Sequence, residues 1–304
     1  MHASTVLLID DDLKYGNNLS SEIIATGFHL IMKPNLKDGM ETLAASRRIK
    51  AVILDGHCRL DDDQPGEPKT NFVFHALQQI RDLEHEQNRL IPFCICSEKP
   101  EAFGDDLSGI APVFRKNEDH PKMFEFLHGQ IRNLPDSIIR HHHHDIFENI
   151  ELVYDDEEED LLIDLIQAAG LHDPLAIDAN LASLRRLLEK LADRCYSGFI
   201  SARNTSGEKR KGGFIKLTFQ SLGDRYLLPR ELMKSAFFVY SFCSEHGSHA
   251  DTGQERVRYI PGNYAYQRVL FTFLELLAYC LGELAESRDR RNKAGQTPIH
   301  LKSL

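Results

Sequence analysis

Two apolar runs of the chain lead directly into aspartates. Residues 6–9 are followed by Asp10 and Asp11, and residues 51–54 are followed by Asp55. Such runs are typical of buried strands, and the carboxyl ends of parallel strands meet at one edge of a sheet, where open α/β folds bind ligands. Carboxylates gathered there repel one another, and a divalent cation relieves that repulsion. Because hard oxygen donors suit Mg²⁺, the residues predict a magnesium site in which one carboxylate is free to react.

These aspartates need a sheet to bring them together, and the first 134 residues show the pattern of one. Strand-like apolar runs alternate with stretches typical of amphipathic helices. This alternation predicts an α/β domain with a doubly wound, five-stranded parallel sheet and helices on both faces. The expected strands are 5–9, 28–32, 51–55, 91–96 and 112–115, and the expected helices are 13–26, 37–47, 70–87 and 120–133.

Two more polar side chains stand at the ends of the later strands. Ser97 ends the fourth strand, and Lys116 ends the fifth. With the three aspartates, they make residues 1–134 resemble a response-regulator receiver domain, a flavodoxin-like module of two-component signalling. The resemblance implies that the Asp55 carboxylate accepts a phosphoryl group and forms an acyl phosphate.

The resemblance also implies roles for the neighbours of that phosphoryl group. Asp11 would hold Mg²⁺ directly, Asp10 would hold it through water, and the backbone carbonyl of His57 would add another oxygen. The metal would neutralise charge on the transferring group. Lys116 would pair with the phosphoryl oxygens. The Ser97 hydroxyl would move to donate to them, and such a movement can switch a protein surface.

Several positions depart from the usual receiver pattern. The residues expected to accept the phosphoryl group are intact, but those that usually communicate it differ. The departures are Cys58-Arg59 in place of a Met-Pro pair, Glu98 in place of a small residue, Asn117 in place of a proline and Val113 in place of an aromatic residue.

Beyond residue 134 the pattern changes. We interpret residues 135–147, which contain the histidines His141–His144, as a linker; a metal-binding surface and a helix end are the alternatives. Residues 148–304 predict a mainly helical domain with a β-hairpin between 199 and 219. Its basic tip, Lys209-Arg210-Lys211, is typical of a solvated turn, and contact with nucleic acid is the alternative.

Two aromatic-rich stretches, 229–246 and 264–287, predict helices. They are either the central pair of the second domain or part of a homodimer interface. Cys243, His246 and His249 have the spacing of metal ligands, but a core cysteine beside loop histidines is favoured because no fourth ligand is evident. The sequence shows neither a phosphate-binding Gly-Lys-Ser/Thr loop nor a helix-turn-helix.

The composition favours a soluble, cytoplasmic protein. Of the 304 residues, 42% are hydrophobic and 27% are charged, with a net charge of −10. The first residues lack the pattern of a signal peptide. The longest apolar run, 269–281, is too short and too polar to span a bilayer. Six scattered cysteines are typical of reduced core thiols.

Together these observations predict a response regulator-like signalling protein. A histidine kinase or another phosphodonor would phosphorylate Asp55 with Mg²⁺, and residues 148–304 would respond as the output domain. No enzyme activity is expected beyond self-phosphorylation and self-dephosphorylation. Two alternatives stay open: a phosphorylation-independent interaction or scaffold protein, and a nucleic-acid-binding regulator. The second would use residues 196–304, where 16 bases outnumber 10 acids.

Overall fold

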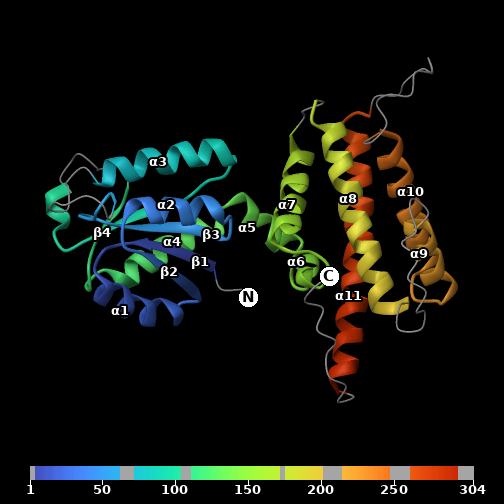
Figure 1. Ribbon diagram of the computed structural model, residues 1–304, viewed down its shortest axis with the longest axis horizontal. Helices are drawn as coiled ribbons and strands as arrows, with labels where there is room; N and C mark the ends of the chain where they lie inside the picture. The colour runs from blue at the N-terminus through green and yellow to red at the C-terminus, as the bar shows by residue number, and fades with distance from the viewer. Residues whose placement is uncertain are drawn as a thin grey trace. The chain divides into compact units, whose positions relative to one another are not determined.

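The protein consists of two compact units, residues 1–138 and residues 139–304. The computed structural model (Figure 1) describes residues 4–61, 72–103, 111–171, 175–200, 214–246 and 261–293. All six cysteines are free and buried. Within the described residues, no helix is both long enough and apolar enough to cross a membrane.

The first unit is built on a five-stranded, fully parallel sheet with the order β2-β1-β3-β4-β5. This is the flavodoxin-like, doubly wound order, in which the chain reverses direction across the sheet after β2. The predicted fold class of this unit is therefore confirmed. The strands are β1 (Ser4–Ile9), β2 (Phe28–Lys33), β3 (Ile49–Asp55), β4 (Phe93–Ser97) and β5 (Val113–Arg115).

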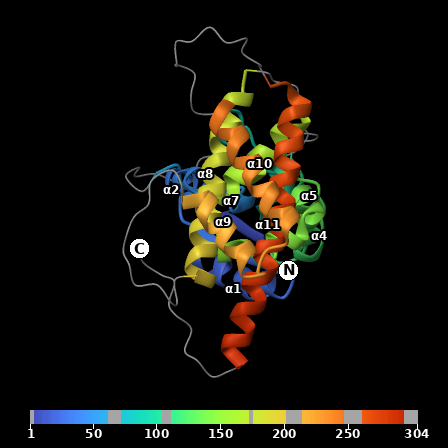
Figure 2. The ribbon, with the colours of Figure 1, turned by 90° about the vertical axis from the view of Figure 1, so that its right-hand side faces the viewer.

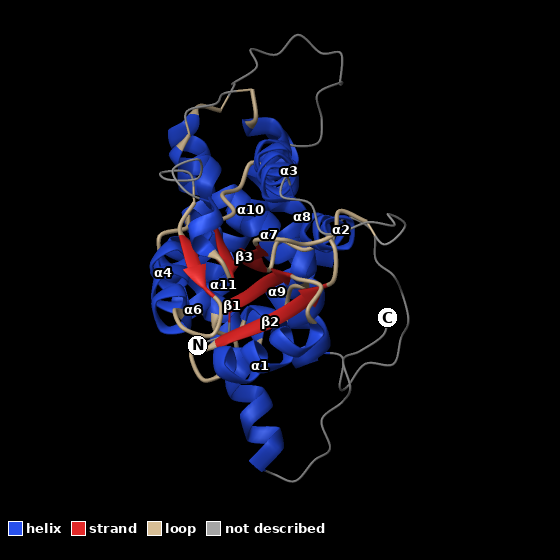
Figure 3. Cartoon of the chain, turned by 90° about the vertical axis from the view of Figure 1, so that its left-hand side faces the viewer, coloured by secondary structure: helices blue, strands red, loops and turns tan. Residues whose placement is uncertain are grey.

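Alternating side chains of the strands form two separate cores. Leu7 and Ile9 of β1 pack with α2 and α3, whereas Val6 and Leu8 pack with α1 and α4. Figure 3 shows this three-layer arrangement, with the sheet between the helices. Because successive strand residues point to opposite faces, continuous apolar runs are needed to bury both. The helices are α1 (Leu13–Ile24), α2 (Leu36–Ala45), α3 (Phe72–Gln87) and α4 (His120–Arg132).

The chain turns from β1 into α1 within three residues. The Asp12 carboxylate accepts hydrogen bonds from the backbone N–H groups of Lys14 and Tyr15, so it caps the helix. Of the three consecutive aspartates, Asp12 therefore has a structural role, and Asp10 and Asp11 remain for the strand edge. Between β4 and β5, the described residues contain one short 3₁₀ helix, η1 (Pro100–Phe103).

Residues 135–147 form helices and contain the boundary between the two units, and their role as a linker stays a prediction. They comprise α5 (Pro135–His142) and α6 (His144–Phe147). Pro135 suits a first helical position because the N–H that it lacks would have no partner there. Ile146 and Phe147 are buried in the core of the second unit, which explains why the segment is ordered as helix. The functional division of the chain into receiver and output domains stays a prediction.

The second unit is helical around a single core, as predicted. Val239 of α10 and Phe273 of α11 are fully buried, and Figure 2 shows these two helices side by side. They therefore belong to the core of the unit, although Phe271 of α11 is exposed. The described elements of this unit after α6 are η3 (Ile150–Leu152), α7 (Asp156–Gly170), α8 (Ile177–Cys195), the π-helix η4 (Tyr196–Ile200), α9 (Phe214–Asp224), α10 (Arg230–His246) and α11 (Asn263–Lys293).

The predicted hairpin is wrong where the structure describes it. Residues 214–219 begin α9 instead of forming a strand. Ile215 is 5% exposed and Phe219 is fully buried, whereas Leu217 is 48% exposed. Residues four apart share one face of a helix, while 217 lies on another, so an alternating pattern was mistaken for strand periodicity. The basic tip, Lys209-Arg210-Lys211, lies outside the described residues.

We expect two substitutions in α9 to show whether residues 214–219 form a helix or a strand. Ile215→Ala should lower the free energy of unfolding by about 2–5 kcal/mol because it leaves a cavity in the core. Leu217→Ala should lower it by less than about 1 kcal/mol because that side chain is half-exposed. Urea denaturation of both variants measures the difference. Equal losses would contradict the helix, since a strand would place both side chains on the same face.

Candidate functional site

Four polar side chains lie together at the carboxyl edge of the sheet. Asp10 follows β1, Asp55 ends β3, Ser97 ends β4 and Lys116 follows β5. Their exposed fractions are 0%, 7%, 2% and 9%, respectively. These side chains share one edge of the sheet because all five strands run in the same direction. The structure thus brings together side chains that are far apart in the sequence.

Lys116 joins the two buried aspartates. Its Nζ lies 2.7 Å from Asp10 Oδ2 and 2.9 Å from Asp55 Oδ1. The other oxygen of Asp10 accepts a hydrogen bond from the Asp12 backbone N–H at 2.8 Å. The backbone holds Lys116 in place, because its N–H donates to the Ser97 carbonyl at 2.9 Å. A lysine thus neutralises part of a carboxylate pocket that would otherwise be strongly repulsive.

Burial and charge shift the proton affinities of these groups. Burial raises the pKa of Asp55 to about 6, the Asp10 charge adds to the rise, and Lys116 opposes it. Burial also raises the pKa of Asp10, against the opposing effect of Lys116. For Lys116, burial alone would lower the pKa, but the charges of Asp55 and Asp10 outweigh it and raise the pKa. The lysine is therefore held in its charged form.

Asp10, Asp11 and Asp55 form a group that can hold a metal ion. Each offers a carboxylate oxygen, and these oxygens lie within 4.8 Å of one another. Arg59 lies near the rim, with its Nε 3.5 Å from Asp11 Oδ2. Three carboxylates against the two cations Lys116 and Arg59 leave one excess negative charge when all are ionised, and an all-oxygen donor set fits Mg²⁺. The carbonyl ligand predicted at His57 stays a prediction.

Ser97 lies against the backbone that follows Asp55. A Cβ added to Gly56 would come within 2.6 Å of Ser97 Oγ, so this approach requires glycine. Ser97 Oγ accepts a hydrogen bond from the Lys99 backbone N–H at 3.2 Å. The hydroxyl is therefore beside the Asp55 strand end, as the sequence predicts, and a local backbone contact orients it.

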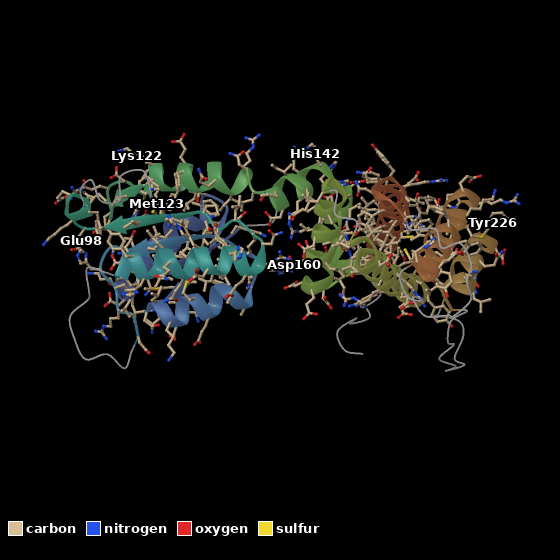
Figure 4. All side chains as sticks on the ribbon, turned by 90° about the horizontal axis from the view of Figure 1, so that it is seen from above. Glu98, Lys122, Met123, His142, Asp160 and Tyr226 are labelled. Carbon is tan, nitrogen blue, oxygen red and sulfur yellow. The ribbon has the colours of Figure 1, made fainter. Side chains whose placement is uncertain are left out.

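The residues that depart from the receiver pattern differ in their surroundings. Glu98, labelled in Figure 4, is exposed, and its backbone carbonyl accepts a hydrogen bond from Arg115 at 3.0 Å. Val113 packs with the α2–α3 core. Phe114 faces the other core, with its ring centroid 5.9 Å from that of Phe126. The aromatic residue of β5 is therefore at position 114, and it faces the opposite side of the sheet from Val113.

A buried network beside the site was missed in the sequence. The Lys116 ammonium lies 4.6 Å from the centroid of the Tyr15 ring. The Tyr15 hydroxyl contacts Cys96 Sγ at 3.0 Å and His120 Nε2 at 3.1 Å. His120 Nδ1 lies 2.7 Å from Glu22 Oε2. Packed side chains therefore connect the site to a half-exposed carboxylate on α1.

His120 also holds the turn that follows Lys116. Asn117 has a φ of 62°, in the left-handed region that asparagine tolerates better than most residues. Its backbone N–H donates to His120 Nε2 at 3.1 Å. In a neutral ring, Nε2 is then the acceptor and Nδ1–H donates to Glu22. The sequence carries no clear signal for this network, because Tyr15 and His120 stand at the beginnings of two helices that are far apart in the chain.

The other metal sites considered in the sequence gain no support. Among the described residues, Asp10, Asp11 and Asp55 form the one group of histidine, cysteine or acidic side chains close enough to bind a metal. His141–His144 thus form no such group. Cys243 is buried in the helical core, and His249 lies outside the described residues.

No model of a known protein family matches the chain, and no curated protein matches it. One similar solved structure is a response regulator receiver domain protein from Clostridium thermocellum, with 14% identity, a TM-score of 0.33 and coverage of 42% of this chain and 94% of that one. Another is a fusion containing amino acids 181–211 of the yeast Spc42 trimeric coiled coil, with 8% identity, a TM-score of 0.34 and coverage of 42% and 75%. The order of the strands, β2-β1-β3-β4-β5, defines the fold of the first unit.

We expect Asp55→Asn to change the pH dependence of stability in metal-free buffer. A carboxyl with a raised pKa in the folded state contributes stability at low pH, and that contribution is lost as the pH rises through about 6. Relative to wild type, the variant should therefore gain on the order of 1–3 kcal/mol between about pH 4 and about pH 7.5. Urea denaturation with EDTA at both pH values measures this gain. A constant difference would contradict it.

We expect Tyr15→Phe and His120→Ala to be energetically coupled. The phenyl ring keeps its contact with the Lys116 ammonium but loses the hydroxyl that reaches His120. A double-mutant cycle in urea should give a coupling energy of about 0.5–3 kcal/mol. His128→Ala is the matched control, because His128 stacks on Phe28 and makes no contact with Tyr15 in the described structure. Additivity in both cycles would exclude the network.

Proposed function

We propose that this protein is a response regulator-like signalling protein that accepts a phosphoryl group on Asp55. The observation that carries the proposal is the geometry of one sheet edge. There Lys116 contacts both Asp10 and Asp55, and Ser97 lies beside the strand end that carries Asp55. This combination of nucleophile, cation and hydroxyl suits phosphoryl transfer better than proton transfer or hydrolysis of an organic substrate.

The residues can share the work as follows. An Asp55 oxygen attacks phosphorus, a new O–P bond forms, and the bond from phosphorus to the donor breaks as the leaving group departs with its electron pair. Lys116 pairs with the phosphoryl oxygens, and the Ser97 hydroxyl donates to one of them. Asp10 and Asp11 would hold Mg²⁺, which supplies positive charge to the transferring group.

The donor would be a histidine kinase or another phosphorylated protein. A phosphoramidate or an acyl phosphate has a phosphoryl group that is readily transferred to a carboxylate. The helical unit, residues 139–304, would then respond to the acyl phosphate. We propose it as the output domain because its core is separate from that of the sheet.

One observation favours a second function, that of a phosphorylation-independent interaction protein. Lys116 already occupies the space between the two buried aspartates and offsets their charge without a metal. A pocket of this kind can be a stable structural element. The two functions differ in whether Asp55 reacts.

We expect incubation with acetyl phosphate and Mg²⁺ to add about 80 Da to the full chain, the mass of one phosphoryl group. Intact mass spectrometry at neutral pH measures the gain. Asp55→Asn should lose it, whereas Asp61→Asn, which alters a partly exposed acid paired with Lys37, should keep it. EDTA should reduce the gain sharply.

Two outcomes would contradict this expectation. A mass gain that persists in Asp55→Asn would show that another residue accepts the phosphoryl group. No gain in a folded wild-type chain, even with a panel of phosphorylated donor domains, would favour the interaction protein. Circular dichroism of each variant establishes that it is folded.

A further inference from the structure

One face of α11 exposes aromatic and charged side chains to solvent. Tyr264 is 83% exposed and Phe271 is 55% exposed, although both are large and apolar. Arg268 and Glu275 are also exposed on this helix. The opposite side of α11 is fully used in the core, where Phe273 and Leu277 are completely buried. The exposed residues are therefore not needed for the core of the unit.

The exposed positions follow a regular seam along the helix. Steps of four and three residues alternate from Tyr264 onward, which is the a/d spacing of a helix that packs against a second helix. The next position at this spacing, Ala278, is partly buried against the core, so the exposed stripe ends at Glu275. The exposed residues of this stripe, which we call the α11 seam, are Tyr264, Arg268, Phe271 and Glu275.

We propose that the α11 seam binds the α11 seam of a second copy of this chain in antiparallel orientation. The charges of the seam determine the orientation. Arg268 lies three residues before Phe271 and Glu275 lies four residues after it. An antiparallel pair centred near Phe271 therefore places Arg268 beside Glu275 of the partner subunit. A parallel pair in register would oppose like charges.

Phe271 would lie at the centre of this interface. Aromatic residues and arginine are the side chains that most often dominate binding energy, especially when they are central. Arg268 is already oriented, because its guanidinium lies 5.1 Å from the centroid of the Phe238 ring on α10. The two-fold symmetry of such a pair also gives a closed dimer.

The interface is long enough for a stable helix pair. An antiparallel pair centred near Phe271 overlaps residues 263 to about 280 of each α11, which corresponds to roughly 25 Å of helix at 1.5 Å per residue. Polar residues at the core positions of a helix pair lower its affinity, but they specify its register and orientation. We therefore expect a dimer of moderate affinity whose geometry is set by charge.

Sedimentation equilibrium of the full chain tests the proposal. At about 100 µM the wild type should sediment as a dimer. Phe271→Glu should weaken dimerisation at least tenfold, because it buries an unpaired charge at the centre of the interface. Tyr226→Glu is the matched control, since Tyr226 is a 96% exposed aromatic residue at the α9–α10 turn (Figure 4). A wild type that stays monomeric, or a dimer unaffected by Phe271→Glu, overturns the proposal.

A charge exchange tests the orientation. Arg268→Glu and Glu275→Arg should each weaken the dimer, because each opposes like charges across the two-fold axis. The double variant restores opposite charges and should regain most of the wild-type affinity. Circular dichroism confirms that each variant is helical. Single variants that dimerise normally, or a folded double variant that stays monomeric, overturn the antiparallel arrangement.

Discussion

The contact of Lys116 with both Asp10 and Asp55 is the interaction on which the first unit depends. Two carboxylates without solvent would repel each other, and the lysine makes their burial tolerable. Removing one partner of such a buried pair typically costs about 3–5 kcal/mol. Loss of one of the three side chains would therefore leave an incompletely paired buried charge at the strand ends of β1, β3 and β5. The same contact leaves negative charge in excess, since Asp11 is nearby, and this excess makes the pocket attractive to a cation.

The surroundings of Lys116 explain how a flexible side chain is kept in place. Its ammonium group lies over the Tyr15 ring, and the Tyr15 hydroxyl contacts Cys96 and His120. Each of these residues is buried in the core shared by α1, α4 and the sheet. Any change in charge at Asp55 would act first on Lys116 and then on this packed network. The structure thus offers a physical route from the site to α1 and α4 that does not use an aromatic residue at position 113.

Much of the first unit could be predicted because its signals are local. Continuous apolar runs and their acidic ends are properties of short segments, and parallel order follows from their alternation with helices. The second unit was harder, because α9 alternates over six residues as a strand would, and its helix is stabilised by Ile215 and Phe219 packing into the core. The helices within residues 135–147 were equally hard to predict. A polar, histidine-rich surface hides the two apolar residues that anchor α6.

The amino-acid sequence by itself determined which residues could meet, since Asp10, Asp55, Ser97 and Lys116 each stand at a strand end. It also determined that the first unit must bury both faces of its sheet. Only the tertiary structure decided how those residues contact one another: that Asp12 caps α1, that Lys116 joins two aspartates, and that Tyr15 and His120 support it. It likewise decided which aromatic residues of α11 are buried and which are exposed. The physical reason is that strand formation depends on near neighbours, whereas burial, ion pairing and pKa depend on residues far away in the chain.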